Sequence, residues 1–235
     1  MKHFRIFILL LIAAIAGSCN KSDTQGTGIG DAVIVAKKIG SNTEYGIALY
    51  AYTFSSFKSV TAVSDIHPGK TYTLKANQGY TTNFFYQTPD AEFTTTVPEA
   101  TTFTFSATFT NGVSNTFQDI LTNKALPLPV FEKCQYNSSL SAIDVIWTLL
   151  TDADSYAITI WDGPTLVFGS TELNNTKNYY SIFGSGNGWA SGFTPKNGNT
   201  YIVRLSAFLH EPGGDSYNMQ ATSMSETPVV WGMAQ

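Results

Sequence analysis

The sequence predicts an all-β protein built as two tandem β-sandwiches behind a removable leader and a short tether. Aromatic residues make up 14% of the chain and charged residues only 13%, a composition typical of β-strands with one buried and one solvent-exposed face. Short apolar runs alternate with turn residues after residue 30, and no segment there has a helical period. About 217 residues follow the leader, enough for two sandwiches of about 100 residues each.

Residues 1–18 have the features of an export signal. Lys2 and Arg5 provide positive charge, residues 6–16 are apolar without interruption, and small residues occupy positions 16–18. A membrane-spanning helix needs about 20 apolar residues, more than this run contains. We therefore expect the segment to be a signal peptide that is removed during export.

A cysteine directly follows the small residues. The stretch Ala16-Gly17-Ser18-Cys19 resembles the bacterial lipobox, whose cysteine is alkylated with diacylglycerol and becomes the first mature residue. The resemblance implies a lipoprotein that is held on a membrane through the lipid on Cys19, and we expect it in the outer membrane of the cell envelope. The alternative is a plain secretory signal with an incidental cysteine. The leaflet, and exposure to the periplasm or to the cell surface, are left open.

The chain that follows the leader is acidic and begins with a tether. Loss of residues 1–18 removes two basic residues, so 13 basic and 17 acidic residues become 11 and 17, a net charge of −6. A mildly acidic surface disfavours nucleic acid as a partner. Residues 19–30 are rich in Gly, Ser and Thr, which predicts a lipidated, flexible tether with a root-mean-square reach of about 18 Å.

Residues 31–125 form the first predicted sandwich. In the run TTFTFSATF, strict alternation predicts that Phe103, Phe105 and Phe109 face a core while the threonines face solvent. The segment IHPGKTYTLKA resembles the turn and following strand of a fibronectin type III domain, and the remaining strand-like runs resemble an immunoglobulin-like domain. An insertion between that turn and TTFTFSATF departs from the type III spacing, so the strand order of this sandwich is left open.

The second predicted sandwich covers residues 126–235. Pro127 and Pro129 hold themselves and the residues before them in extended conformations, which places the domain boundary at KALPLPVFEK. Strand-like runs then resume, among them SYAITIWDG and NTYIVRLSAFL.

This second half carries a family pattern. The segment ADSYAITIWDG, followed by FTPKNGNTYIVRLSAF, resembles the fibronectin type III pattern, in which an aromatic residue opens the third strand and a leucine-x-proline turn precedes an alternating strand. Phe193 and Pro195 occupy the turn, Trp147 occupies the position of the family's core tryptophan, and the alternating positions are Tyr201, Val203, Leu205 and Ala207. The resemblance implies the fold and no activity.

No motif points to catalysis, a metal or a cofactor. His67 and His210 each stand alone, and Cys134 is expected to be a small buried apolar residue. Asp152 and Asp154 are explained more simply by a turn than by calcium, because the Gly and the distant Glu of a calcium loop are missing. We therefore expect a non-enzymatic protein without a cofactor.

The remaining candidates for function are aromatic side chains that the sequence predicts to be exposed on the second sandwich. When Tyr201 and its alternating partners face the core, Trp161, Arg204 and Phe208 turn outward on neighbouring strands. Trp189 lies in a Gly-rich turn, so the sequence predicts an exposed ligand-binding patch of Trp161, Trp189, Arg204 and Phe208. The alternative is that Trp161 and Phe208 are covered by the EPGGDSYNMQ loop or by the first sandwich.

Two functions are consistent with these features. The first is a lipid-anchored envelope protein that presents a binding sandwich to a glycan or protein ligand. The second is a structural or assembly component of an envelope or adhesive complex, with no small ligand. A coplanar aromatic pair with polar groups at its rim would favour sugar stacking, whereas a larger flat apolar patch would favour a protein partner.

Overall fold

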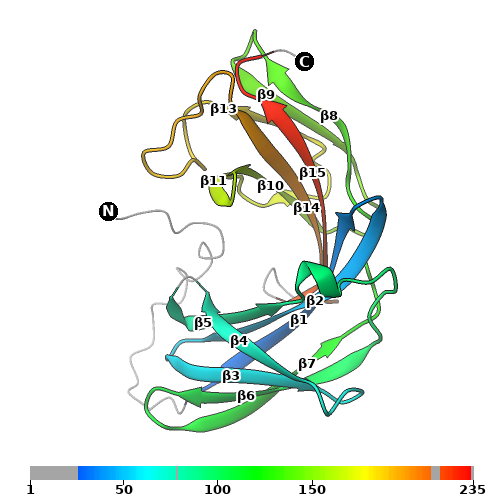
Figure 1. Cartoon of the computed structure of the whole chain (residues 1–235), viewed down its shortest axis with the longest axis vertical. Coiled ribbons are helices and arrows are strands. Elements are labelled where there is room, and N and C mark those ends of the chain that lie inside the picture. The colour runs from blue at the N-terminus through cyan, green and yellow to red at the C-terminus, as the bar shows by residue number, and fades with distance from the viewer. Residues whose placement is uncertain (1–25, 78, 213–217, 234–235) are drawn as a thin grey trace. The chain divides into compact units, whose positions relative to one another are not determined.

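The computed structural model describes residues 26–77, 79–212 and 218–233, which form strands and one short 3-10 turn (Figure 1). The protein is therefore all-β, as the composition and the alternating runs predict. None of the described segments is a helix long and apolar enough to cross a bilayer. The signal peptide and Cys19 lie outside the described residues.

The described residues divide into two compact units. The N-terminal unit contains residues 26–126 together with 209–212 and 218–222, and the C-terminal unit contains residues 127–208 and 223–233. The sequence assigned the whole of 126–235 to the second sandwich. In the structure, residues 209–212 and 218–222 group with the N-terminal unit.

The N-terminal unit holds seven strands in the order β1-β2-β5-β4-β3-β6-β7, with all described pairs antiparallel. The elements are β1 (Gly28–Ile39), β2 (Asn42–Thr53), β3 (Phe57–Ser64), β4 (Thr71–Asn77), β5 (Tyr80–Gln87), the 3-10 turn η1 (Asp90–Glu92), β6 (Thr101–Phe109) and β7 (Ser114–Leu121). The two ends of this path meet, since the Ala32 N–H donates to Asp119 Oδ2 at 2.7 Å and Asn115 donates to the Gly26 carbonyl at 3.2 Å.

Strand β1 begins inside the segment expected to be tether. Gly28 and Gly30 lie so close to the core that an added Cβ would meet Phe117 at 2.2 Å and Phe105 at 2.5 Å, respectively. The missing side chains are what let this glycine-rich stretch pair with β2. The tether predicted over 19–30 therefore ends before Gly28.

The core of the N-terminal unit confirms the alternation predicted for β6. Phe103, Phe105, Ala107 and Phe109 are buried, and the intervening residues are more exposed. The ring of Phe57 on β3 packs against Phe109 with centroids 5.1 Å apart, and Phe105 stacks on Phe117 at 5.3 Å.

The C-terminal unit has a four-stranded path, β11-β10-β14-β15, and a three-stranded sheet, β13-β9-β8. Its strands are β8 (Val130–Asn137), β9 (Ala142–Thr148), β10 (Ser155–Asp162), β11 (Thr165–Gly169), β12 (Leu173–Asn174), β13 (Tyr179–Phe183), β14 (Thr200–His210) and β15 (Met219–Val230), with β12 also pairing with β10.

The residues predicted to form the core of this unit are buried. Trp147 from the three-stranded sheet and Tyr156 from the four-stranded path are fully buried, with ring centroids 5.5 Å apart. Tyr201 is also buried, and its hydroxyl accepts a hydrogen bond from the Lys196 N–H at 3.0 Å, a tyrosine-to-upstream-backbone contact of the kind found in immunoglobulin-like folds. Trp231 lies in the same core.

Candidate functional site

The residues predicted to form a ligand patch begin on β10 and β14. These strands are antiparallel neighbours, with Thr159 opposite Arg204 and Trp161 opposite Ile202. Odd-numbered residues of β14 from Tyr201 to Ala207 are buried, and the even-numbered ones are half-buried. Trp161, Arg204 and Phe208 therefore project from the outer face of these strands.

Trp161 and Arg204 form an ordered row with Glu226 of β15. The Arg204 guanidinium lies 4.7 Å from the Trp161 ring centroid, a cation–π distance, and pairs with the Glu226 carboxylate at 2.6 Å. The Trp161 Nε1–H donates to Thr159 Oγ1 at 3.0 Å. One face of the indole is thus occupied by a guanidinium that is itself held in place.

Phe208 does not belong to this row. It lies opposite Ser155 on β10, four residues along β14 from Arg204, which corresponds to about 13 Å of strand. The backbone carbonyl of Phe208 accepts a hydrogen bond from the Asp154 N–H at 2.8 Å.

Trp189 is packed among other rings. It contacts Phe168, Phe193 and Trp231, with centroid distances of 5.0, 5.5 and 5.7 Å, and its Nε1–H donates to the Phe183 carbonyl at 2.7 Å. No ring contact joins Trp161 to Trp189 among the described residues. The coplanar tryptophan pair that would favour sugar stacking is therefore not formed by these two side chains.

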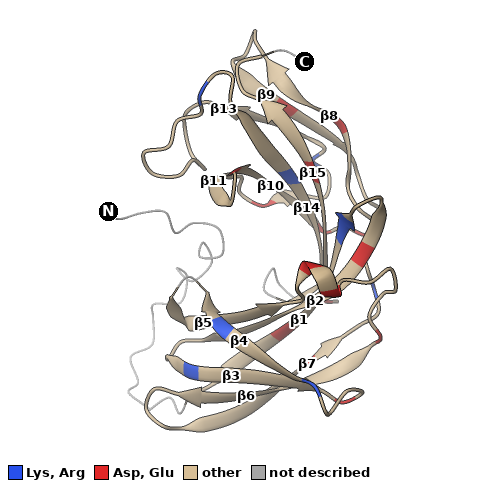
Figure 2. Cartoon of the chain, viewed as in Figure 1, with Lys and Arg blue, Asp and Glu red and all other residues tan. Residues whose placement is uncertain are grey.

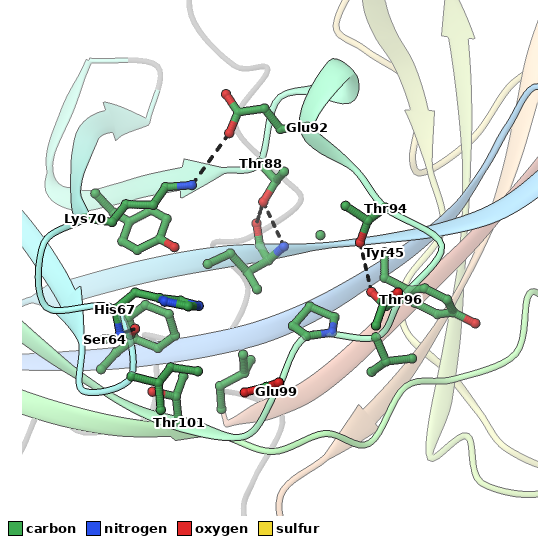
Figure 3. A pocket seen from close by; sticks show the side chains of 18 of the residues that line it. Tyr45, Ser64, His67, Lys70, Thr88, Glu92, Thr94, Thr96, Glu99 and Thr101 are labelled. Atoms are coloured by element: carbon green, nitrogen blue, oxygen red, sulfur yellow. Dashed lines mark hydrogen bonds and ion pairs between the residues drawn. The ribbon is translucent and has the colours of Figure 1, made fainter.

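A groove that sequence reasoning missed lies in the N-terminal unit (Figure 3). Its volume is about 740 Å³, within the usual range for small-molecule sites. One wall is the β3–β4 turn, residues 64–70, and the other is the β5–β6 connection, residues 88–101. Tyr45, Gly46 and Ile47 of β2 also line it.

Hydrogen bonds between residues far apart in the sequence hold the β5–β6 connection over β2. Tyr45 and Thr94 exchange two backbone hydrogen bonds, at 2.7 and 3.0 Å. Thr88 Oγ1 accepts from the Ile47 N–H at 2.9 Å. Gly46 permits this close approach, because an added Cβ would lie 2.8 Å from Thr88 Cβ and 2.9 Å from the Phe93 ring. The one sequence feature that could have indicated the groove is the insertion before TTFTFSATF, which forms this connection.

The groove combines an apolar floor with a polar rim. Buried side chains form the floor, and threonine hydroxyls line the walls; the floor residues are Ile47, Tyr72, Phe103 and Leu121. At the rim, Lys70 pairs with Glu92 at 3.7 Å and lies 5.0 Å from the Tyr72 ring centroid. His67 and Glu99 also line the groove. Within the described residues, neither side chain has a hydrogen bond or ion pair, so both are available to a ligand.

The described residues contain no group of histidine, cysteine and acidic side chains arranged to hold a metal ion. Cys134 is half-buried, not fully buried as expected. Loss of solvation raises the pKa of its thiol to about 12, which keeps it protonated and unreactive at neutral pH.

A buried carboxyl in the N-terminal unit is also unsuited to catalysis. Asp31 on β1 is only 2% exposed, and its Oδ2 has no hydrogen-bond partner. Burial, and then the charge of Asp119, raise the pKa of Asp31 to about 8, although the Met219 N–H donates to it. Because protein covers this carboxyl, a substrate has no access to it.

Comparison with known proteins gives structural likenesses and no family. No family model matches the chain, and no curated protein matches it. A solved two-domain fibronectin type III segment of chicken tenascin is similar at 15% identity and a TM-score of 0.27, covering 77% of this chain and 91% of that one.

Bacterial surface proteins show similar likenesses. The BSP domain of a biofilm-associated protein is 10% identical with a TM-score of 0.27, covering 89% of this chain and 52% of that one. A segment of a 1.5-MDa bacterial ice-binding adhesin is 13% identical with a TM-score of 0.26, covering 85% and 64%, respectively. With TM-scores this low, the likenesses identify neither a ligand nor an activity for this chain.

Proposed function

We propose that this chain is a lipid-anchored, non-enzymatic binding protein of the bacterial cell envelope. Its two sandwiches, the first immunoglobulin-like and the second fibronectin type III-like, present a site for a glycan or protein ligand. Residues 1–18 are the signal peptide, and Cys19 carries the lipid. The groove of the N-terminal unit is the observation that carries the binding function, because it offers a hollow of ligand size with unpaired polar groups at its rim.

The chemistry of the groove favours a glycan. Lys70 and His67 bring donors to the rim, and Glu92 and Glu99 bring acceptors, over an apolar floor. A sugar hydroxyl both donates and accepts, so one ligand class can satisfy both kinds of group, while the carbon-bound hydrogens of the sugar ring pack on the floor. Two acids beside one lysine and one histidine disfavour a strongly charged ligand.

The Trp161–Arg204–Glu226 row is proposed as a second contact surface, better suited to a protein than to a sugar. Tryptophan and arginine are enriched where protein interfaces concentrate their binding energy. The ion pair with Glu226 fixes the arginine before binding, so little side-chain freedom is lost when a partner docks.

The structural role is the alternative, and one observation favours it. β8 and β13 are the two edges of the three-stranded sheet, and Val130, Tyr179 and Phe183 on them are exposed. Open edges with apolar side chains are suited to pairing with another strand. In this case the chain would self-associate or assemble without a glycan.

A single position in the groove separates these functions. An added Cβ on Gly69 meets nothing within 4 Å, and Gly69 is not among the glycines with positive φ, so Gly69→Trp adds a large side chain to the groove wall without a steric clash. Gly69→Ala is the matched control. On a glycan array, we expect the Gly69→Trp variant to lose about tenfold or more of wild-type retention and the Gly69→Ala variant to keep it. Equal retention by both variants, or none by the wild type, would contradict glycan binding in this groove.

A further inference from the structure

The N-terminal unit has a second distinctive end, opposite the groove. Strand β3 runs from Phe57 at this end to Ser64 at the groove, seven steps that correspond to about 23 Å. The β2–β3 turn, the β6–β7 turn and the first residues of β1 gather there. This end of the unit, defined by residues 26–30, 53–58 and 109–115, is called the entry end.

Hydrogen bonds join the segments of the entry end. The Thr53 hydroxyl donates to the Thr27 carbonyl at 2.7 Å, and the Thr110 N–H donates to the Ser56 carbonyl at 2.9 Å. The Thr81 hydroxyl, from the start of β5, donates to Ser56 Oγ at 3.1 Å. The turn carrying Phe54 is therefore fixed next to the point where the chain enters β1.

The entry end exposes apolar side chains. Phe54 is 86% exposed, the largest value among the exposed large hydrophobic residues of the described chain, and Ile29 and Val113 are 58% and 38% exposed. Contacts within the unit explain the burial of the neighbouring Phe57 and Phe109, which pack against each other. They leave Phe54 with no partner for its ring among the described aromatic side chains.

The charge of the entry end differs from that of the groove. Residues 26–30, 53–58 and 109–115 contain no aspartate or glutamate, and their one charged residue is Lys58. At the groove end, the β5–β6 connection carries Glu92 and Glu99 on the groove wall and Asp90 on η1, where Figure 2 shows acidic positions. Anionic lipid headgroups would be repelled by the groove end and accepted by the entry end.

The tether sets the distance between the entry end and the anchor. Eight residues, 20–27, separate Cys19 from Gly28, so the nine Cα–Cα steps between them span at most about 32 Å. A lipid on Cys19 therefore keeps the entry end near the bilayer at high effective concentration, so that even a weak contact is populated.

We propose that the Phe54 turn docks on the membrane that holds the Cys19 lipid, with the Phe54 ring in the headgroup region and Ile29 and Val113 beside it. The inference rests on the proposed lipid anchor. Aromatic side chains favour this interfacial region, and Lys58 adds attraction to anionic lipids. The contact would orient the N-terminal unit with its groove directed away from the bilayer.

The test uses full-length lipidated protein reconstituted into vesicles of phosphatidylethanolamine and phosphatidylglycerol. Phe54→Trp reports the entry end, and Ile66→Trp, at an exposed position on the groove wall, is the matched control. The four native tryptophans all lie in the C-terminal unit, so the wild-type spectrum is subtracted as background. Lipids brominated on the acyl chain then quench any indole that reaches the bilayer.

We expect the added emission of the Phe54→Trp variant to fall about twofold or more in brominated vesicles, and the added emission of the Ile66→Trp variant to stay unchanged. Unquenched emission from Phe54→Trp, or equal quenching in both variants, overturns the inference. A blue-shifted but unquenched signal from Phe54→Trp also overturns it, because the indole would then be buried against another protein copy.

Mass spectrometry of the N-terminal peptide reads the lipid on Cys19 separately. A chain without lipid overturns the proposed anchor. A lipidated chain whose Phe54→Trp emission is not quenched overturns only the docking, so the two failures are distinguishable.

Discussion

The two ends of the N-terminal unit are built from the same strands and differ in almost every surface property. The groove end has long connections, acidic residues on the wall formed by the β5–β6 connection, and unpaired polar groups above an apolar floor. The entry end has tight turns, no acids, and the most exposed phenylalanine of the described chain. Strands fix the distance between the ends, and the turns are free to specialise. The difference suggests that one end meets a ligand and the other meets the membrane.

The largest expected effect removes the anchor on which this contrast depends. Cys19→Ala eliminates the thiol that the lipid is attached to, so incorporation of radiolabelled palmitate should be lost completely while the chain still folds. Circular dichroism of the purified variant provides the folding control. A variant that still carries label would show that the lipid is attached at another residue. The tether from Cys19 would then no longer hold the entry end near the bilayer.

The next largest effect concerns the strand that connects the two ends. Asp31 has a folded-state pKa of about 8, above its ordinary value near 4. Between these values the folded state holds a proton that the unfolded state has released, so the free energy of unfolding falls as the pH rises through that window. Asp31→Asn removes this dependence and should stabilise the protein at pH 7 by up to about 4 kcal/mol relative to wild type.

Denaturant titrations of wild type and Asp31→Asn at pH 5 and pH 7 measure this effect. Burial also raises the pKa values of Asp119 and Glu211, so a smaller slope of the same sign should remain in the variant. Identical pH profiles for the two proteins would mean that Asp31 is ionised in the fold.

A smaller effect tests whether the C-terminal unit competes with the groove for the ligand. Trp161 and Trp189 are both half-buried. Trp189→Ala removes three ring contacts and should cost about 2 kcal/mol of unfolding free energy, whereas Trp161→Ala should cost about 1 kcal/mol. Glycan retention should be unchanged in both variants once the protein is folded. Loss of glycan retention in Trp161→Ala alone would show that the glycan binds at the Trp161–Arg204–Glu226 row and not in the groove.

Period-two patterns explain what the sequence could predict. The buried phenylalanines of β6, the outward Arg204 and the core position of Trp147 each follow from local alternation or from a family pattern. Trp189 differs, because its partners Phe168, Phe193 and Trp231 come from separate segments, and a Gly-rich turn carries no alternation to reveal them.

The groove and the burial of Asp31 depend on contacts between distant segments. An insertion before β6 signalled an irregular region, but the Tyr45–Thr94 bridge that folds it over β2 has no local signature. The carboxyl of Asp31 accepts a hydrogen bond from the backbone of Met219, near the other end of the chain. A sequence read one element at a time shows an acid at the start of a strand and does not show what lies over it.

Hydrogen–deuterium exchange on vesicle-anchored protein tests the central claim, the division of the N-terminal unit into a membrane end and a ligand end. The reference is the chain from residue 20, produced without leader or lipid and mixed with the same vesicles. We predict that anchoring slows exchange severalfold in residues 53–58 and 109–115 and leaves residues 64–70 and 88–101 unchanged. Protection of the groove segments by the vesicle, or equal exchange at the entry end in both proteins, would contradict the account.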